Sequence, residues 1–363
     1  MASYFLHVGQ VTTNEPGDFG ICSFQYDDIK NTIEQTSYYA LPGFGYMVST
    51  MDEKMIYVAA SYDGAWLYAF TFNTNSKSLQ LLNRKQVSKD GGLSHLQIDM
   101  DNRLLLTTCY KTGNIYLFQL LPDGSIGNLL SSAKQSGSSI NKERQESAHP
   151  HSVFLAPPDN KYAVVPDLGA DKLFIYHIDK DFGKLSLQGV HMVCSGMAPR
   201  FFTFHPNAHF GYLLTELSNH IIVYDFNSDS GEMLFKQIAC CLPDEYVAKA
   251  KILSGADIHF SPDKRFLFAS NREHNSLVRF EVNEKTGQIS NPIYTKTLNW
   301  PRGFYFSKDG KYMFVCDEVN DEVGSEGMIQ VFAYEIKGGL LSPLKSLPVD
   351  RACNLAIRIE SYD

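Results

Sequence analysis

Short apolar runs alternate with polar turns along the whole chain, and the same arrangement recurs many times. The segment His149–Asp167 shows it clearly: a polar start, an apolar run, a Pro-Asp-Asn turn and a second apolar run that ends on an acid. Val, Ile, Tyr and Phe in such runs favour β-strands, and the residues between them favour tight turns. Six copies contain the turn and the strand that follows it: Met51–Val58, Met100–Leu106, Pro158–Val164, His205–Tyr212, Ser261–Phe268 and Ser307–Phe314.

Each copy continues with a third apolar run, a further turn and a weaker fourth run. The third runs are Trp66–Phe72, Ile115–Leu120, Leu173–Ile178, Ile221–Phe226, Leu277–Val282 and Ile329–Tyr334. The copies recur at a period of roughly 45–57 residues, the range in which the four-stranded blades of a β-propeller repeat. The pattern therefore predicts an all-β chain of radial four-stranded sheets.

The two ends of the chain complement each other. Cys353–Ile359 has the character of a first strand with no successor, whereas Tyr4–Val8 and Gly20–Gln25 have the character of second and third strands with no predecessor. Joining them closes the ring and leaves no long exposed sheet edge. We therefore predict a seven-bladed β-propeller that forms a single domain over residues 1–363. A β-sandwich, or two smaller β-domains, would not require one repeat through the entire chain.

Composition and charge limit the partners that the chain can have. It has 363 residues, 44% of them hydrophobic, and a formal net charge of −8 with a pI of about 5.8. A nucleic-acid-binding surface would be basic, and no apolar run is long enough to cross a bilayer, so we expect neither nucleic acid nor membrane as a partner. The seven cysteines show no zinc spacing, and the N-terminus lacks a signal-peptide pattern, so we expect a cytoplasmic protein without a cofactor.

Candidate chemistry gathers at one face of the predicted ring. In each blade the first strand begins, and the second strand ends, on the same face near the axis. First strands begin near His95, His151, Arg200, Asp257, His259 and Arg302. Second strands end near Tyr62, Tyr110, Asp167, Glu216, Arg272, Asp317 and Glu318. The opposite face carries ordinary turn residues, so acids, bases and arginines are expected at one mouth of the central channel.

This mouth has the composition of an anion-binding site. Arginine offers a rigid fork of donors that suits carboxylate or phosphate, so Arg200, Arg272 and Arg302 together predict a small anionic ligand. His151 and Glu216 supply groups that move protons near neutral pH. The long loops expected at Ser131–Ser147 and Cys240–Ser254 would cover the pocket, and Ser131–Ser139 is interpreted as loop throughout. In the simpler alternative, each histidine is a hydrogen-bonded structural residue and Glu216 pairs with a neighbouring arginine.

Several motifs, in order, resemble the seven-bladed lactonase family. The family includes the bacterial propeller-type 6-phosphogluconolactonase and the fungal 3-carboxy-cis,cis-muconate lactonising enzyme. The resemblance covers nearly the whole chain and is strongest from His149 to Phe304. It is carried by His149–Val153 with Pro158–Asn160, Ala198–Arg200 with Phe204–Pro206, Thr215–Asn219, Gly255–Asp263, Ser270–Arg272 and Pro301–Phe304.

The resemblance implies chemistry on a lactone. It matches the catalytic His, Arg, Glu and Arg of the fungal enzyme to His151, Arg200, Glu216 and Arg272. Asp257, His259 and Arg302 lie in motifs closer to the phosphogluconolactonase branch, and we expect them, with His95, to bind substrate. The first hypothesis is therefore hydrolysis of 6-phospho-D-glucono-1,5-lactone, a reaction of pentose phosphate pathway type, with His151 or Glu216 as the general base.

Three alternatives stay open at this point. The same site could close a carboxymuconate as a cycloisomerase, or the propeller could bind a ligand or protein without catalysis, because fold alone does not define function. A calcium lactonase is the third, with oxygen ligands from Asp167, Glu216, Asn271 and Asp317. Arginines at the same mouth argue against a divalent cation, so no metal is expected.

Overall fold

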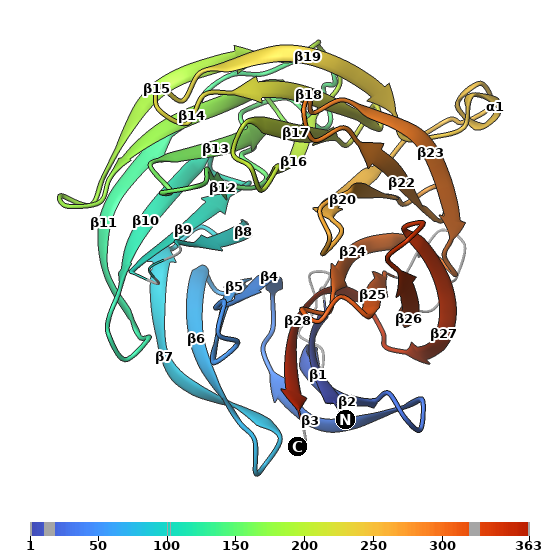
Figure 1. The fold of residues 1–363 in the computed structure, drawn as a ribbon. Helices are drawn as coiled ribbons and strands as arrows, with labels where there is room; N and C mark the ends of the chain where they lie inside the picture. The colour runs from blue at the N-terminus through green and yellow to red at the C-terminus, as the bar shows by residue number, and fades with distance from the viewer. Residues whose placement is uncertain (1, 11–18, 100, 102, 319–326, 362–363) are drawn as a thin grey trace.

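Seven sheets stand around a central axis like the blades of a propeller, and Figure 1 looks along that axis. The computed structural model describes residues 2–10, 19–99, 101, 103–318 and 327–361. Over these residues the chain forms 28 strands, grouped in seven four-stranded antiparallel sheets, and one short helix. The expected seven-bladed propeller is confirmed.

Every sheet runs from an innermost strand at the axis to an outermost strand at the rim. The innermost strands are β28 (Ala352–Ser361), β4 (Phe44–Ser49), β8 (Leu93–Ile98), β12 (Phe154–Leu155), β16 (Pro199–Phe204), β20 (Gly255–Phe260) and β24 (Pro301–Phe306). The second strands are β1 (Ala2–Gln10), β5 (Met55–Ser61), β9 (Leu104–Cys109), β13 (Tyr162–Asp167), β17 (Phe210–Thr215), β21 (Phe266–Asn271) and β25 (Tyr312–Asp317).

The outer half of each sheet follows the same order. The third strands are β2 (Gly20–Asp27), β6 (Ala65–Asn73), β10 (Asn114–Leu120), β14 (Lys172–Asp179), β18 (His220–Phe226), β22 (Ser276–Val282) and β26 (Met328–Glu335). The fourth strands are β3 (Thr32–Ala40), β7 (Ser78–Ser88), β11 (Ile126–Lys134), β15 (Lys184–Met192), β19 (Met233–Cys240), β23 (Ile289–Lys296) and β27 (Leu340–Pro348). The helix α1 (Asp244–Val247) lies in the connection between β19 and β20.

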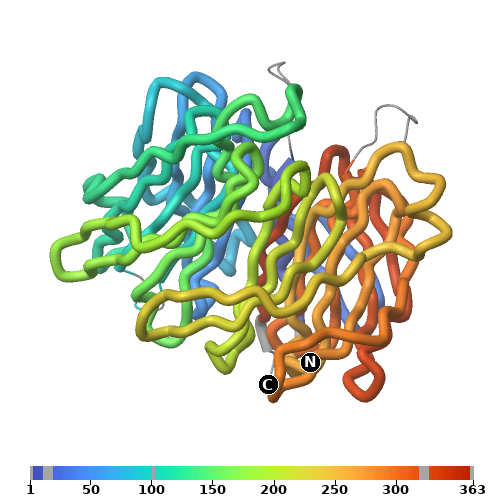
Figure 2. Tube along the Cα trace, turned by 90° about the horizontal axis from the view of Figure 1, so that it is seen from above, coloured from blue at the N-terminus to red at the C-terminus, as the bar shows by residue number. Residues whose placement is uncertain are grey.

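The two ends of the chain close the ring. Strand β28 pairs with β1 in antiparallel register, with Phe5 opposite Arg358 and Val8 opposite Leu355. The N- and C-termini consequently lie close together on one side of the ring (Figure 2). The expectation that Cys353–Ile359 supplies the innermost strand of the first blade is confirmed.

Burial decreases from the middle of each blade to its rim. Every residue of β9, β13, β17 and β21 is buried, because these strands have a neighbour on both edges and an adjacent blade on both faces. Apolar layers fill the space between blades; Val164 of β13, for example, packs in one cluster with Leu213 and Ile222 of the next blade. The outermost strands are largely exposed, as in β27.

β-Bulges interrupt the start of several innermost strands. The register between β16 and β17 shifts between Pro199 and Phe201, and that between β24 and β25 shifts between Pro301 and Gly303. A bulge adds one residue to a strand and changes the direction of its side chain. The inserted residues here are Arg200 and Arg302, so the local backbone sets where these guanidinium groups can reach.

Two segments differ from the sequence prediction or lie partly outside the described residues. The loop expected at Ser131–Ser139 is wrong in its first part, because Ser131–Lys134 completes β11 and pairs with β10. Serine is tolerated there because an outermost strand faces solvent. The turn expected in Met100–Leu106 includes Met100 and Asn102, which lie outside the described residues.

Within the described part of the chain, no helix has the length and apolar character needed to span a membrane.

Candidate active site

A carboxylate surrounded by guanidinium groups lies at one end of the ring axis. Arg200 donates a hydrogen bond from Nε to Glu216 Oε2 at 2.8 Å, and Arg272 Nη2 lies 3.3 Å from the same oxygen. Arg144 donates from Nη2 to Glu216 Oε1 at 2.7 Å. Both carboxylate oxygens of Glu216 are therefore engaged by arginine.

Strand direction explains why these residues meet. Arg200 is the second residue of β16, whereas Glu216 directly follows β17 and Arg272 directly follows β21. The start of an innermost strand and the end of a second strand lie at the same end of the ring. Arg200 and Glu216 come from one blade and Arg272 from the next, so the structure brings these three predicted residues together from two adjacent blades.

Arg302 joins the same end of the axis but has its own carboxylate. Its Nη1 donates to both oxygens of Glu318 at 2.8 Å, and Glu318 directly follows β25. Burial alone would lower the pKa of Arg302, but the negative charge of Glu318 outweighs burial and raises it. Arg302 is thus a fixed positive charge whose field also reaches Arg200 and Arg272.

The cluster carries an excess of positive charge. Burial would raise the pKa of Glu216, but Arg272, Arg200 and Arg144 hold it well below its usual range. Burial also lowers the pKa of Arg200 to about 9, with a further contribution from Arg272. The guanidinium groups outnumber the carboxylates that interact with them. The guanidinium groups are those of Arg144, Arg200, Arg272 and Arg302, and the carboxylates are those of Glu216, Glu318 and Asp257. This imbalance favours a bound anion.

His151 lies beside this cluster as a neutral imidazole. It precedes β12, and its backbone N–H donates to Pro166 O at 2.9 Å. Burial, and then the charge of Arg200, lowers the pKa of its side chain well below the ordinary histidine value. Among the described residues, its Nδ1 is buried without a hydrogen-bond partner. A buried, unpaired ring nitrogen next to an anion site is a candidate proton acceptor.

Arg144 was not among the residues predicted from the sequence. It lies on the long connection between β11 and β12, which the sequence suggested only as a cover for the pocket. Its side chain is 42% exposed, whereas that of Arg200 is 5% exposed. A basic residue in a long loop on the expected face was the available signal, but no strand register could show where it points.

Asp257, His259 and His95 lie deeper along the axis than the arginines. Asp257 is the third and His259 the fifth residue of β20, and His259 Nε2 lies 3.0 Å from Asp257 Oδ1 without the alignment of a hydrogen bond. His95, the third residue of β8, accepts a hydrogen bond on Nδ1 from Val153 N at 3.3 Å. The predicted substrate-binding residues therefore lie at two depths along the axis. Arg302 lies with the arginine cluster at the end of the axis, whereas the other three lie deeper in the channel.

Aromatic rings surround this deeper level. The centroid of the His95 ring lies 4.3 Å from that of the Tyr46 ring and 5.1 Å from that of the Phe201 ring. The hydroxyl groups of Tyr46 and Tyr305 lie 3.2 Å apart. Burial lowers the pKa of His95 to about 3, so this ring is neutral and packs as an aromatic side chain.

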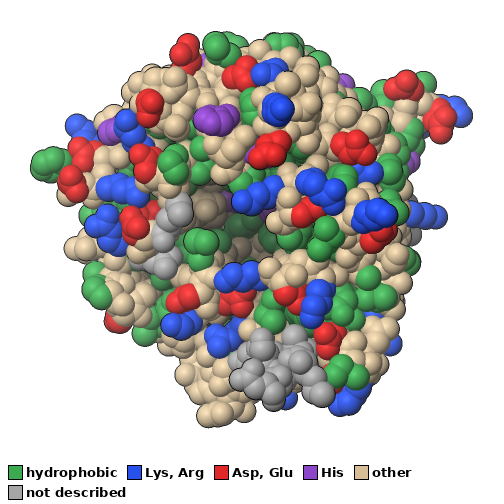
Figure 3. Space-filling model, viewed as in Figure 1, with side chains coloured by type: hydrophobic (Ala, Val, Ile, Leu, Met, Phe, Trp, Pro, Cys, Tyr) green, Lys and Arg blue, Asp and Glu red, His purple; other side chains and the backbone are tan. Residues whose placement is uncertain are grey.

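A cavity of about 630 Å³ lies below this layer, at the other end of the axis. Its lining includes His95, His259 and Tyr305, together with Phe204 and Phe306 from the last residues of β16 and β24. Figure 3 views the ring from the side of the chain termini and shows it hollowed near its centre. His95 and His259 therefore face this cavity, on the opposite side of the aromatic layer from Arg200.

The candidate calcium ligands form hydrogen bonds with other protein groups. Asp167 accepts hydrogen bonds on Oδ1 from the backbone N–H of His149 and Ala170, at 2.8 and 2.9 Å. Asn271 donates to Cys241 O at 3.0 Å, and Asp317 is hydrogen-bonded by Gln330. Among the described residues, no three His, Cys, Asp or Glu side chains gather as metal ligands would. These groups hold loops and strand ends in place.

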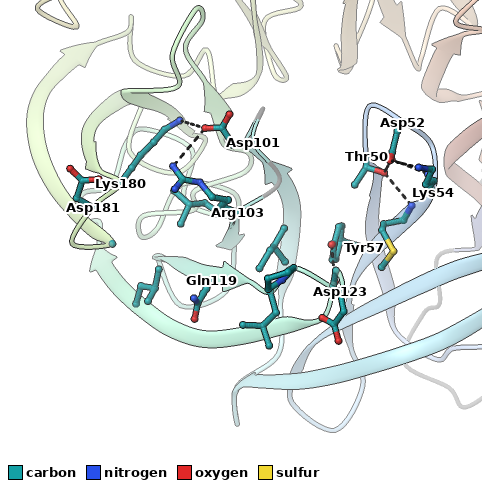
Figure 4. Close-up of a pocket in the computed structure, with 18 of the residues that line it drawn as sticks. Thr50, Asp52, Lys54, Tyr57, Asp101, Arg103, Gln119, Asp123, Lys180 and Asp181 are labelled. Carbon is teal, nitrogen blue, oxygen red and sulfur yellow. Dashed lines mark hydrogen bonds and ion pairs between the residues drawn. The ribbon is translucent and has the colours of Figure 1, made fainter.

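A cavity of about 750 Å³ lies away from the axis, between the turns of the second, third and fourth blades (Figure 4). Several of its charged side chains pair with one another: Lys180 Nζ lies 3.4 Å from Asp101 Oδ2, and Lys54 Nζ lies 3.5 Å from Asp52 Oδ2. Because its lysines are already paired with carboxylates, the cavity resembles a solvated groove more than a reactive site.

The chain belongs to the lactonase, 7-bladed beta-propeller family, whose pattern it matches over residues 5–355. This confirms the family that the motifs suggested and, with it, the expectation of an enzyme of the lactone-hydrolase class.

Individual relatives cover nearly the whole chain. The sequence is 32% identical over 350 residues to the 6-phosphogluconolactonase of Bacillus subtilis, covering 95% of each chain. It is 27% identical to the 6-phosphogluconolactonase of Formosa agariphila over 93% of this chain and 95% of that one. A crystal structure of a Bacteroides fragilis protein provisionally named 6-phosphogluconolactonase superposes with a TM-score of 0.84 at 26% identity, over 98% of both chains.

Proposed function

We propose that this protein hydrolyses 6-phospho-D-glucono-1,5-lactone to 6-phosphogluconate, a step of pentose phosphate pathway type. The observation that carries the proposal is the excess of guanidinium groups beside a neutral, unpaired histidine at one end of the axis. The relatives named 6-phosphogluconolactonase support the choice of substrate. The phosphate would bind to arginine in the forked geometry that suits it.

His151 acts as the general base in this proposal. Its ring is neutral, and its buried Nδ1 has no hydrogen-bond partner among the described residues, so it can accept a proton from a water molecule that enters the site with the substrate. The water oxygen forms a bond to the lactone carbonyl carbon, and the carbonyl oxygen takes up negative charge. The bond to the ring oxygen then breaks, and the proton returns from His151 to that leaving oxygen. Water and lactone thereby yield the open-chain acid.

The arginines and Glu216 have separate roles. Arg200 and Arg272 stabilise the negative oxygen of the tetrahedral intermediate, because buried, fixed donors stabilise developing charge strongly. Glu216 does not act as the base, because arginines occupy both of its carboxylate oxygens, whereas Nδ1 of His151 has no hydrogen-bond partner among the described residues. It orients the guanidinium groups instead, and Asp257 and Arg302 act as further substrate-binding residues.

The test is steady-state hydrolysis measured against the spontaneous rate, by acid release in a weakly buffered indicator solution. The substrates are 6-phosphogluconolactone and unphosphorylated glucono-1,5-lactone, with a parallel absorbance assay on 3-carboxy-cis,cis-muconate for the cycloisomerase alternative. We expect His151→Asn to lower kcat by about 10²–10⁴-fold, the usual contribution of general-base catalysis. Hydrolysis at the spontaneous rate by the folded wild type would refute the proposal.

A further inference from the structure

Arg144 differs from the other arginines of the cluster in its surroundings. Arg200 and Arg272 are almost completely buried, and Arg302 is held by both oxygens of Glu318. Arg144 is 42% exposed and holds Glu216 through Oε1, whereas Arg200 and Arg272 lie against Oε2. It therefore sits at the outer edge of the cluster, where an entering ligand would meet it first.

The backbone at Arg144 is fixed although its side chain is not enclosed. The neighbouring Gln145 is fully buried and donates from Nε2 to Leu168 O at 2.9 Å. The backbone N–H of Arg144 donates to Asn141 Oδ1 at 3.1 Å, and the backbone N–H of Gln145 donates to Asn141 O at 2.7 Å. A rigid Cα position with a long, half-exposed side chain lets the guanidinium group exchange partners without movement of the loop.

Exchange of partners at Arg144 leaves no buried charge alone. If Arg144 turns from Glu216 to a ligand, Arg200 and Arg272 still neutralise Glu216. Tyr110 also interacts with Arg144. The ring of Tyr110 stacks on that of His149, with 4.3 Å between the ring centroids, and lies beside the Arg144 side chain. The opposite exchange, in which Arg200 leaves Glu216, would break a fully buried pair.

We propose that Arg144 determines specificity by binding the outer anionic group of the substrate, in exchange for Glu216 Oε1. This rests on the proposed function, and it assigns the phosphate of the lactone to Arg144 and the carbonyl end to the deeper Arg200, Arg272 and His151. Arg144 thus distinguishes a phosphorylated lactone from a neutral one, and it contributes to substrate binding more than to the chemical step.

The experiment compares Arg144→Gln and Arg144→Lys with the wild type on 6-phosphogluconolactone and on glucono-1,5-lactone. We expect Arg144→Gln to raise KM for the phosphorylated lactone at least tenfold, with less than a twofold change for the neutral lactone and little change in kcat. Arg144→Lys should recover part of the loss, because it restores the charge but not the fork of donors. The matched control is Lys142→Gln, which removes one positive charge from an exposed position two residues away.

The outcomes separate this assignment from the proposed function. An equal rise in KM for both lactones, or a fall in kcat for both, would show that Arg144 only supports Glu216 and would overturn the proposal. Calorimetric binding of 6-phosphogluconate and of gluconate gives a second measurement that needs no turnover. If the wild type hydrolyses neither lactone, the proposed function fails, but selective loss of 6-phosphogluconate binding in Arg144→Gln would still support the role of Arg144. Unchanged 6-phosphogluconate binding would refute it.

Discussion

Arg200 and Glu216 form an almost completely buried ion pair, with 2.8 Å between Nε and Oε2. Removing one partner of such a pair leaves the other charge without compensation and costs about 3–5 kcal/mol of folding free energy. We therefore expect Glu216→Gln to lower the free energy of unfolding by several kcal/mol, measured by urea denaturation at pH 7, and to lower activity by displacing the arginines.

Asp52→Asn is the control for this change. Asp52 lies 3.5 Å from Lys54, both side chains are at least half exposed, and exposed ion pairs contribute about 0–1 kcal/mol. A Glu216→Gln protein as stable as the Asp52→Asn protein would contradict the role of Glu216 as the counter-charge of the buried arginines.

The pH dependence of hydrolysis should report the state of His151. Burial and Arg200 lower its pKa well below the ordinary value of 6.5, so the ring stays neutral, and able to accept a proton, below that pH. We expect kcat/KM on the acid side to stay level through pH 6.5 and to decline only at lower pH. Initial rates in buffers of constant ionic strength measure this, and a decline centred at or above pH 6.5 would exclude a buried His151 as the base.

The repeat made most of the fold predictable, because turn chemistry and strand composition recur in every blade. The ends were also predictable, since Cys353–Ile359 lacked a following strand and Tyr4–Val8 lacked a preceding one. Strand direction alone then brought Arg200, Glu216 and Arg272 to one end of the axis. These conclusions depend on the order of elements, which a sequence pattern carries well.

The depth of each side chain could not be predicted in the same way. His95 and Arg200 both lie near the start of an innermost strand, yet His95 packs on Tyr46 and Arg200 reaches Glu216. Both strands carry a bulge, between Pro199 and Phe201 in β16 and between Leu93 and His95 in β8, but Arg200 is the bulged residue whereas His95 follows the bulge. A bulge shifts register by one residue without a clear sequence signal. Arg144 was missed because its position depends on loop contacts such as that of Gln145 with Leu168.

Buried histidines should make the protein sensitive to acid. Burial lowers the pKa of His7 and of His95 to about 3, from 6.5. The unfolded chain binds protons at these groups below pH 6.5 whereas the folded protein does not, so stability is complete above pH 6.5 and falls as the pH drops towards 3. Each pKa unit corresponds to about 1.4 kcal/mol, so the loss per histidine reaches a few kcal/mol.

His7→Phe tests this directly. His7 is fully buried, contacts Phe72 and has a hydrogen bond between Nδ1 and Ser23 Oγ at 2.9 Å. The variant should lose some stability at pH 7, because Ser23 loses its partner, but its unfolding free energy should fall less between pH 6.5 and pH 4 than that of the wild type. Parallel pH curves for the two proteins would show that His7 does not contribute to acid sensitivity.

Closure of the ring by β28 should dominate the stability of the first blade. Leu355 of β28 is 2% exposed, lies opposite Val8 of β1 and packs in one cluster with Leu6 and Phe314. Removing a buried leucine side chain to Cβ costs about 2–5 kcal/mol, so Leu355→Ala should lower the free energy of unfolding by that amount. Leu344→Ala, on the outermost strand β27 of the adjacent blade, is the control, since that side chain is 39% exposed. Equal and small effects in urea denaturation would mean that the packing of Leu355 contributes little to the stability of the first blade. A large effect of Leu355→Ala alone would show that the contacts of β28 with β1 and the adjacent blade stabilise the fold.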